Sequence, residues 1–204
     1  MPKRIGLKKF AVAVLKKDTT EALEYHKILQ LAKNIKVDVK PKTAEGKLYA
    51  DDSLDESNSS VTGYDLSFEI NQLELEDQAL LLGHKIDENG MIAVGPDDQA
   101  PWVAVLFEAP RSDGSTEYRV LNKVKFMLPD ETYETRGENL NYQTPKITAV
   151  SALCAHTGSY GQQVVGNDTN KDVVENWYKK VQLLGGKTAT HDEEEGRPKK
   201  VAKS

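Results

Sequence analysis

Apolar and polar residues alternate along much of the chain, and this period of two predicts β-strands with one buried and one solvent-facing side. Strands are predicted over residues 10–17, 35–40, 64–70, 102–109, 123–126 and 146–153. The stretch "WVAVLFEA" at 102–109 is apolar at nearly every position, which is typical of a central strand buried on both sides. Because no strand–helix repeat accompanies these segments, we expect antiparallel pairing.

Two segments depart from the period of two. Residues 75–84, "LEDQALLLGH", place Leu75, Ala79 and Leu82 at helical spacing, with acids in the first turn and a glycine as a stop. Residues 170–181 place four apolar side chains on one stripe, namely Val173, Val174, Trp177 and Val181. The predicted fold class is therefore mainly β (α+β), with a short helix and a C-terminal helix. Beyond them, residues 185–204 are polar and blockwise charged, so we expect a folded domain over 1–184 and a disordered tail.

The composition is that of a soluble globular protein, with 29% charged and 38% hydrophobic residues among 204. No apolar run approaches the roughly 18 residues that span a membrane. The first ten residues lack the apolar core of a signal peptide because lysines interrupt them, so we expect no membrane partner and no export. The single cysteine, Cys154, excludes an internal disulfide and is predicted to be a small buried residue in a strand.

Charge is distributed unevenly along the chain. Residues 1–50 carry 12 Lys and Arg against 5 Asp and Glu, and residues 51–117 carry 2 against 16. Residues 118–204 are nearly balanced, and the whole chain has a net charge of −5. Such blocks suit a self-associating subunit with surfaces of opposite sign. The alternative is that the folded surface mixes the two signs.

The densest acidic stretch is "LYADDSLDESNSS" at 48–60, with Asp51, Asp52, Asp55 and Glu56. A calcium loop starting at Asp51 would need glycine at its sixth position and glutamate at its twelfth, and this sequence has Glu56 and Thr62 there. A catalytic carboxylate pair needs apolar burial of one partner, and the neighbours here are polar. The stretch is therefore interpreted as an acidic surface loop between strands.

Other chemical motifs are lacking. The four histidines, His26, His84, His156 and His191, share no metal-ligand spacing, and no phosphate loop or nucleophile elbow occurs. The basic N-terminal region has no interleaved aromatics of the kind that bind nucleic acid. We therefore predict no catalytic residue, no cofactor and no metal, and hence a protein that is not an enzyme.

Six segments in fixed order resemble the major tail proteins of long-tailed, non-contractile phages (siphophages). They are "IGLKKFAVAVL" at 5–15, "LYADD" at 48–52, "LEDQALLLGH" at 75–84, "DDQAPWVAVLF" at 97–107, "NYQTPKITA" at 141–149 and "VENWYKKV" at 174–181. The resemblance runs from near residue 5 to near residue 182.

The resemblance implies an antiparallel β-sandwich or barrel of the tail tube type, with residues 75–83 as its flanking helix. It implies that six subunits join their inner sheets into a ring, and that rings stack into a tube around the tape measure protein that later conducts double-stranded DNA. Tail initiator and terminator proteins would be further partners. The expected location is the virion tail, after assembly in the host bacterial cytoplasm.

Specific residues follow from combining the resemblance with the charge blocks. The loop with Asp51, Asp52, Asp55 and Glu56 resembles one that reaches a neighbouring subunit or ring, and its hypothesised basic counterpart is Lys3, Arg4, Lys8, Lys9, Lys16 and Lys17. A DNA conduit must not bind phosphate tightly, so an acidic or neutral lumen is expected. Its candidate residues are Asp65, Ser67 and Glu69, and the alternative is that this face meets solvent outside the tube.

Three alternative functions stay open. A tail terminator or head–tail connector ring is the nearest, since such subunits can have related folds. A monomeric β-sandwich binding module would usually present a row of exposed aromatics, whereas Trp102 and Trp177 lie in apolar segments. A hydrolase using the acids of 48–60 would need a buried partner carboxylate.

Overall fold

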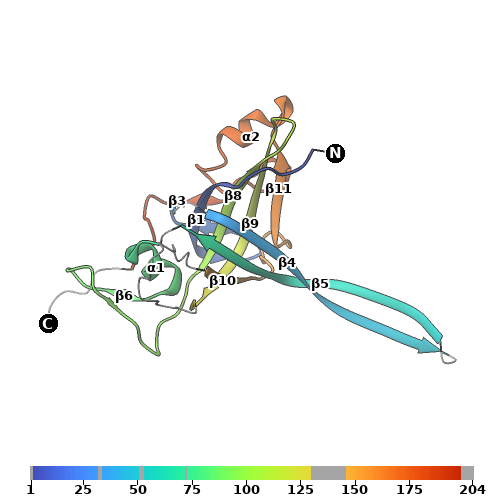
Figure 1. The fold of residues 1–204 in the computed structure, drawn as a ribbon, viewed down its shortest axis with the longest axis horizontal. Coiled ribbons are helices and arrows are strands. Elements are labelled where there is room, and N and C mark those ends of the chain that lie inside the picture. Colours follow the sequence, from blue (N-terminus) through green and yellow to red (C-terminus); the bar gives the residue numbers. More distant parts are fainter. Residues whose placement is uncertain (1, 32–33, 51–52, 72, 130–145, 199–204) are drawn as a thin grey trace, which may run out of the picture.

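The computed structural model describes residues 2–31, 34–50, 53–71, 73–129 and 146–198, with backbone alone for residues 34–35, 45–50 and 53–58 (Figure 1). The strands are β1 (Lys8–Asp18), β2 (Leu23–Tyr25), β3 (Leu29–Gln30), β4 (Asn34–Ala50), β5 (Ser53–Ile70), β6 (Lys85–Ile86), β7 (Ile92–Ala93), β8 (Trp102–Pro110), β9 (Thr116–Met127), β10 (Lys146–Ser151), β11 (Gly161–Val165) and β12 (Thr190–His191). The helices are α1 (Leu75–Leu82) and α2 (Lys171–Glu175), with single 3-10 turns at Asp168–Asn170 and Leu184–Gly186.

One sheet of ten strands forms most of the molecule. Its order is β12-β2-β1-β8-β9-β10-β5-β4, with β3 beside β1 and β11 beside β9. All pairs in it are antiparallel except β12 with β2, so the predicted antiparallel β-rich fold is confirmed. Strand β9 is shared, since its residues 117–121 pair with β11 and its residues 124–127 pair with β10.

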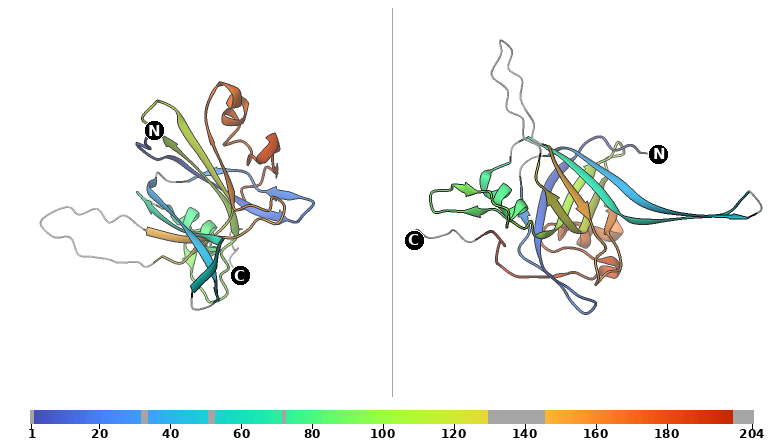
Figure 2. Two further views of the ribbon diagram at one scale, coloured as in Figure 1. Left: turned by 90° about the vertical axis from the view of Figure 1, so that its right-hand side faces the viewer. Right: turned by 90° about the horizontal axis from the view of Figure 1, so that it is seen from below.

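The sheet curls until its two halves face each other. Phe10 of β1 and Phe68 of β5 have ring centroids 5.2 Å apart, although β8, β9 and β10 lie between these strands in the sheet. Neighbouring strands are about 4.8 Å apart, so a flat sheet would hold these rings roughly 19 Å apart. Figure 2 shows the curl of the sheet with α1 beside it. The concave side encloses the larger core cluster, to which α1 contributes Leu80, Leu81 and Leu82.

The convex side of β1, β8 and β9 carries a second core. Ala11, Ala104 and Leu106 alternate with the residues of the first core and pack with Trp177 and Val181 of the C-terminal region. Every side chain from Val103 to Ala109 is consequently buried. The prediction of a central strand at 102–109 is confirmed, because this strand has a core on each side.

The first predicted helix is confirmed and the second is shorter than predicted. Helix α1 is followed by Gly83, whose φ of 75° is left-handed and ends the helix. Leu75 was expected to face the core, but its side chain is 57% exposed. Helix α2 ends at Glu175, and the chain continues in turns so that Trp177 and Val181 still reach the convex core. Neither described helix has the length and apolar character needed to cross a membrane.

The expectation of a disordered tail from residue 185 is wrong for residues 185–198. Strand β12 pairs with β2, and Ala189 is buried in the convex core. Farther on, Arg197 forms an ion pair of 3.0 Å with Asp77 of α1. Composition indicated a solvated segment, but strand pairing and burial hold it against the sheet. Residues 199–204 lie outside the described residues.

Cys154 is fully buried, as predicted, but it follows β10 and does not lie within it. It forms an isolated bridge with Ser159. Its thiol lies 3.4 Å from Oδ1 of Asp18, which also accepts a hydrogen bond from the backbone N–H of His156. The other carboxylate oxygen of Asp18 accepts hydrogen bonds from Lys123 and from the backbone N–H of Ala155. Asp18 thereby ties the turn after β10 to the end of β1.

Candidate functional site

A long β-hairpin, made by β4 and β5, projects from the body of the protein (Figure 1). Strand β10 accompanies β5 only from Tyr64 to Glu69, whereas β4 and β5 pair with each other as far as Ala50 and Ser53. We call residues 43–62 the distal hairpin. Its eight β4 residues beyond Lys42 extend about 26 Å at the usual rise of a strand.

The acidic stretch lies at the tip of the distal hairpin. The prediction of a loop at 48–60 is wrong for most of its length, since β4 continues to Ala50 and β5 begins at Ser53. Glu56 is opposite Leu48 in the strand register, and Asp55 precedes it in β5. Asp51 and Asp52 lie outside the described residues. The polar composition of this segment predicted a loop, but backbone pairing between β4 and β5 makes it two strands.

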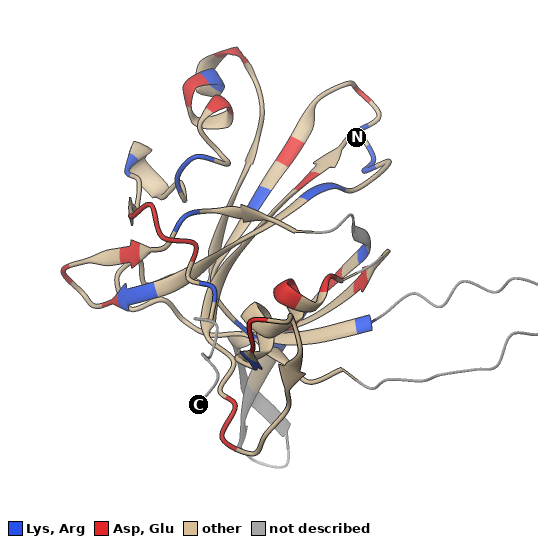
Figure 3. Ribbon diagram, turned by 90° about the vertical axis from the view of Figure 1, so that its left-hand side faces the viewer, with Lys and Arg blue, Asp and Glu red and all other residues tan. Residues whose placement is uncertain are grey.

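The basic residues proposed as its counterpart do not form one surface. Lys8 and Lys9 begin β1, while Lys16 and Lys17 lie near its other end, about 23 Å away along an extended strand. Lys3 belongs to the segment before β1. In Figure 3, basic and acidic segments are interspersed over the body. The single basic region expected from the sequence is thus divided by the length of β1.

Three of these cations already have acidic partners in the same chain. Arg4 donates two hydrogen bonds to Glu117, at 2.6 and 3.0 Å, and Lys16 lies 2.9 Å from Asp192. Lys9, at a bulge of β1 with a left-handed φ of 46°, lies 3.7 Å from the buried Glu108. The hydrogen bonding between Arg4 and Glu117 is the largest cause of the raised pKa of Arg4. It is also the largest cause of the lowered pKa of Glu117.

The candidate lumen residues Asp65, Ser67 and Glu69 share the convex face of β5, opposite the buried Leu66 and Phe68. Their cross-strand partners on β4 are Lys40, Asp38 and Lys36, and Lys146 of β10 is opposite Glu69. Lys42 adds an ion pair of 2.7 Å to Asp65, and Lys36 one of 2.8 Å to Asp38. The hydrogen bond from Lys36 is the largest cause of the lowered pKa of Asp38. This face is therefore a charged surface of mixed sign, with alternating lysines and acids.

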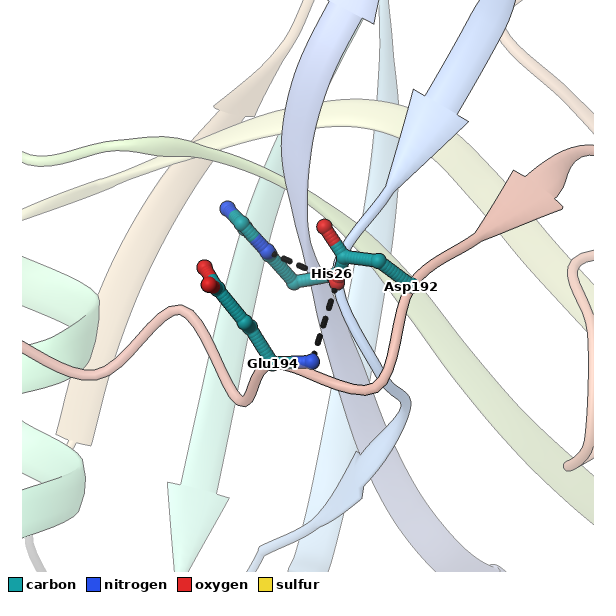
Figure 4. Close-up of side chains that lie close together, drawn as sticks. All are labelled: His26, Asp192 and Glu194. Atoms are coloured by element: carbon teal, nitrogen blue, oxygen red, sulfur yellow. Dashed lines mark hydrogen bonds and ion pairs between the residues drawn. The ribbon is translucent and has the colours of Figure 1, made fainter.

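One cluster has the residue types of a metal site. His26, Asp192 and Glu194 bring potential ligand atoms within 4.8 Å of one another, although the sequence showed no such spacing (Figure 4). Both carboxylate oxygens of Asp192 are engaged, one by His26 at 3.0 Å and the backbone N–H of Glu194, the other by Lys16 at 2.9 Å. Lys16 is the largest cause of the lowered pKa of Asp192. A cation would have to compete with the lysine, so the cluster is best explained as a clasp for the C-terminal segment.

A second histidine–carboxylate pair resembles half of a catalytic relay. His84 is buried, and its Nδ1 lies 2.7 Å from Asp98, which also accepts a hydrogen bond from the backbone N–H of Gly95. That backbone hydrogen bond, followed by His84, lowers the pKa of Asp98. Among the described residues Nε2 of His84 has no hydrogen-bond partner, so no nucleophile is positioned to give it a proton. The pair instead fixes the segment that follows α1.

Comparison with protein-family models and with curated proteins finds no match for this chain.

Proposed function

We propose that this chain is a structural virion protein of a siphophage tail, which assembles into hexameric rings that stack as the tail tube. The observation that supports this most is the distal hairpin. A two-stranded ribbon without a cover is marginally stable in water. Among the described strands, β4 pairs only with β5, and residues 53–62 of β5 pair only with β4. The contact that the body does not provide would come from neighbouring subunits.

The sheet offers a route to ring formation. The outer edge of β4 has no strand beside it in the described part of the chain, and neither has the outer edge of β11. Exposed edges recruit further strands, and joining sheets across subunits removes them. The curled sheet is compatible with the two-layer tail tube arrangement. The six-fold ring and the stacking rest on the resemblance of the sequence segments.

The tube would enclose the tape measure protein and later conduct DNA without specific binding. The charged face around Asp65, Ser67 and Glu69 is the proposed lumen side. Its acids neutralise much of the charge of the adjacent lysines, which limits the phosphate attraction that would slow DNA passage. Initiator and terminator proteins would set the two ends of the tube. No step of this function requires catalysis, a cofactor or a metal.

The proposal is tested by electron microscopy and sedimentation of the full chain. We expect hollow tubes or stacked rings, and we expect them to disappear when residues 44–60 are replaced by Asn-Gly, a turn that joins two strands directly. The truncated variant should keep its cooperative unfolding, because the deleted residues lie outside the body.

Other outcomes would contradict the proposal. Single rings that never stack would favour a terminator or connector ring. A monomer at every concentration, also with a tail initiator complex present, would favour the binding module. Normal tubes from the truncated variant would remove the role of the hairpin.

A further inference from the structure

A cleft of about 330 Å³ opens where β4 faces the segment before β1 and the adjoining ends of β8 and β9. Its apolar wall includes Val37, Val39 and Phe107. Its charged residues are Arg4, Lys36, Arg119 and Glu117, which leaves an excess of positive charge. The cleft therefore combines an apolar wall with cations. It lies along the outer edge of β4, which pairs with no other strand in the described part of the chain.

Arg119 is the unusual residue of this cleft. It is half-buried on β9, opposite Phe107 of β8, yet its guanidinium has no ion pair or hydrogen bond within the described part of the chain. The guanidinium carbon lies 6.0 Å from the centroid of the Tyr64 ring. Burial lowers the pKa of Arg119, although the group stays charged. Its five N–H donors meet no protein acceptor among the described residues, and the fork geometry of a carboxylate matches them.

The other cations of the cleft are already paired. Arg4 is held by Glu117, and Lys36 lies 2.8 Å from Asp38. An incoming anion would therefore be drawn to Arg119, and apolar side chains beside that anion would meet Val37 and Val39. The occupant that fits is a peptide with both carboxylates and apolar residues.

The tip of the hairpin has this composition. Residues 48–56, "LYADDSLDE", interleave Leu48, Tyr49 and Leu54 with four carboxylates. The tip cannot reach the cleft of its own chain, because Val39 in the cleft wall and Leu48 near the tip belong to one strand, about 30 Å apart. The tip must therefore come from another copy, and such a head-to-tail contact continues from subunit to subunit.

We propose that this cleft receives the acidic hairpin tip of a second copy, with a carboxylate bound bidentately by Arg119. The inference rests on the proposed self-assembly for its partner. It replaces the basic counterpart expected from the sequence by a site in which only Arg4 of that earlier set takes part.

The first test compares assembly of the full-length Arg119→Gln variant with that of a matched Lys187→Gln variant, whose side chain is exposed outside the cleft. The concentration for half-maximal assembly should rise about ten- to hundredfold for Arg119→Gln, the loss expected for a charge-assisted hydrogen-bonded pair. For Lys187→Gln it should change less than about twofold. The melting temperature of the Arg119→Gln monomer should change little, since the described residues give this guanidinium no ion pair or hydrogen bond to lose and the Tyr64 ring is 6.0 Å away. Unchanged assembly, or a lower melting temperature with unchanged assembly, would overturn the inference.

The second test uses a cyclic peptide of residues 45–59 as a competitor. It should bind the wild-type chain and inhibit assembly. The peptide with Asp51, Asp52, Asp55 and Glu56 replaced by their amides should do neither, and inorganic phosphate at the same concentration should not compete. Equal competition by phosphate would overturn the proposal in favour of a general anion site.

The two proposals fail separately. If the wild type never assembles, the proposed function fails, while peptide binding that is lost in Arg119→Gln would still establish the cleft. If tubes form and the peptide does not bind, the tube proposal holds and the cleft proposal is overturned.

Discussion

The body of the sheet and the distal hairpin use the same backbone pairing with opposite surroundings. In the body, each side chain of β8 from Val103 to Ala109 is buried, because one core lies on the concave side and another on the convex side. In the distal hairpin, the described side chains from Ser59 to Thr62 are exposed. The pairing of β4 with β5 continues from one region into the other, across a register shift between Lys42 and Thr43. Backbone hydrogen bonds thus form strands in both regions, but burial of side chains makes the body stable without further contacts.

This difference separates the work of the two regions. Burial of apolar area supplies most of the stability of a small domain, and the buried apolar side chains that the structure describes all lie in the body. Among the described residues, the distal hairpin contacts the body near its root, where Tyr160 donates a hydrogen bond to the carbonyl oxygen of Val61. Changes farther along the hairpin should therefore alter association more than folding.

The largest expected effect comes from a matched pair of truncations on β5. Phe68→Ala should lower the free energy of unfolding by about 3–5 kcal/mol, because it removes a ring in contact with Phe10 and Phe126. Val61→Ala, on the distal hairpin and 43% exposed, should change it by less than about 0.5 kcal/mol. Urea unfolding of both variants measures the contrast, and similar losses would contradict it.

A smaller effect on the free energy of unfolding is expected at Asp18, which connects the end of β1 to the turn after β10. Burial alone raises the pKa of Asp18, but the hydrogen bonds from Lys123, Ala155 and His156 outweigh it, so the net pKa lies below the usual value. A depressed pKa contributes stability above the unfolded value of about 3.9, and this contribution is lost as the pH falls below it. Asp18→Asn should therefore cost about 1.5–3 kcal/mol near neutral pH, and the difference from wild type should shrink below about pH 4.

Urea unfolding at several pH values measures this effect, with the exposed Glu88→Gln as the control. A difference between Asp18→Asn and wild type that stays constant with pH would assign its cost to packing and not to charge.

The smallest effect concerns the root of the hairpin. Gly63 is opposite Lys42 at the register shift where the distal hairpin begins, and a Cβ there would lie 2.8 Å from the carbonyl oxygen of Ser151. Gly63→Ala should cost about 1–2 kcal/mol, since the strands must separate slightly. Gly95→Ala, where a Cβ would meet no atom within 4 Å, should be neutral or mildly stabilising. Equal unfolding free energies for the two variants would contradict this prediction, because the strands at the root would then separate without a cost in stability.

The sequence predicted the body better than the hairpin for a physical reason. The alternation of apolar and polar residues in β5 predicts one buried face, and the continuous apolar run of β8 predicts two. Both patterns can be identified within a few residues of sequence. In the distal hairpin, Ser, Asn and acidic residues follow one another without an apolar period of two, so the pattern indicated a loop. The short α2 was mispredicted because turns, in place of a longer helix, bring Trp177 and Val181 to the convex core. The segment up to residue 198 was mispredicted because strand pairing and the ion pairs of Asp192 and Arg197 hold it, and apolar composition records neither.

By itself, the sequence determined the antiparallel β class, the central strand, helix α1 with its left-handed glycine and the position of the acidic stretch. These follow from periodicity, backbone sterics and charge, which act over a few residues. Only the tertiary structure decided that Arg4 meets Glu117, 113 residues away, and that His26 meets Asp192. It also decided that Arg119 lies in a cleft beside β4, without an acceptor among the described residues. Such contacts depend on the curl of the sheet and on strand order, which bring together residues whose local sequence carries no record of one another.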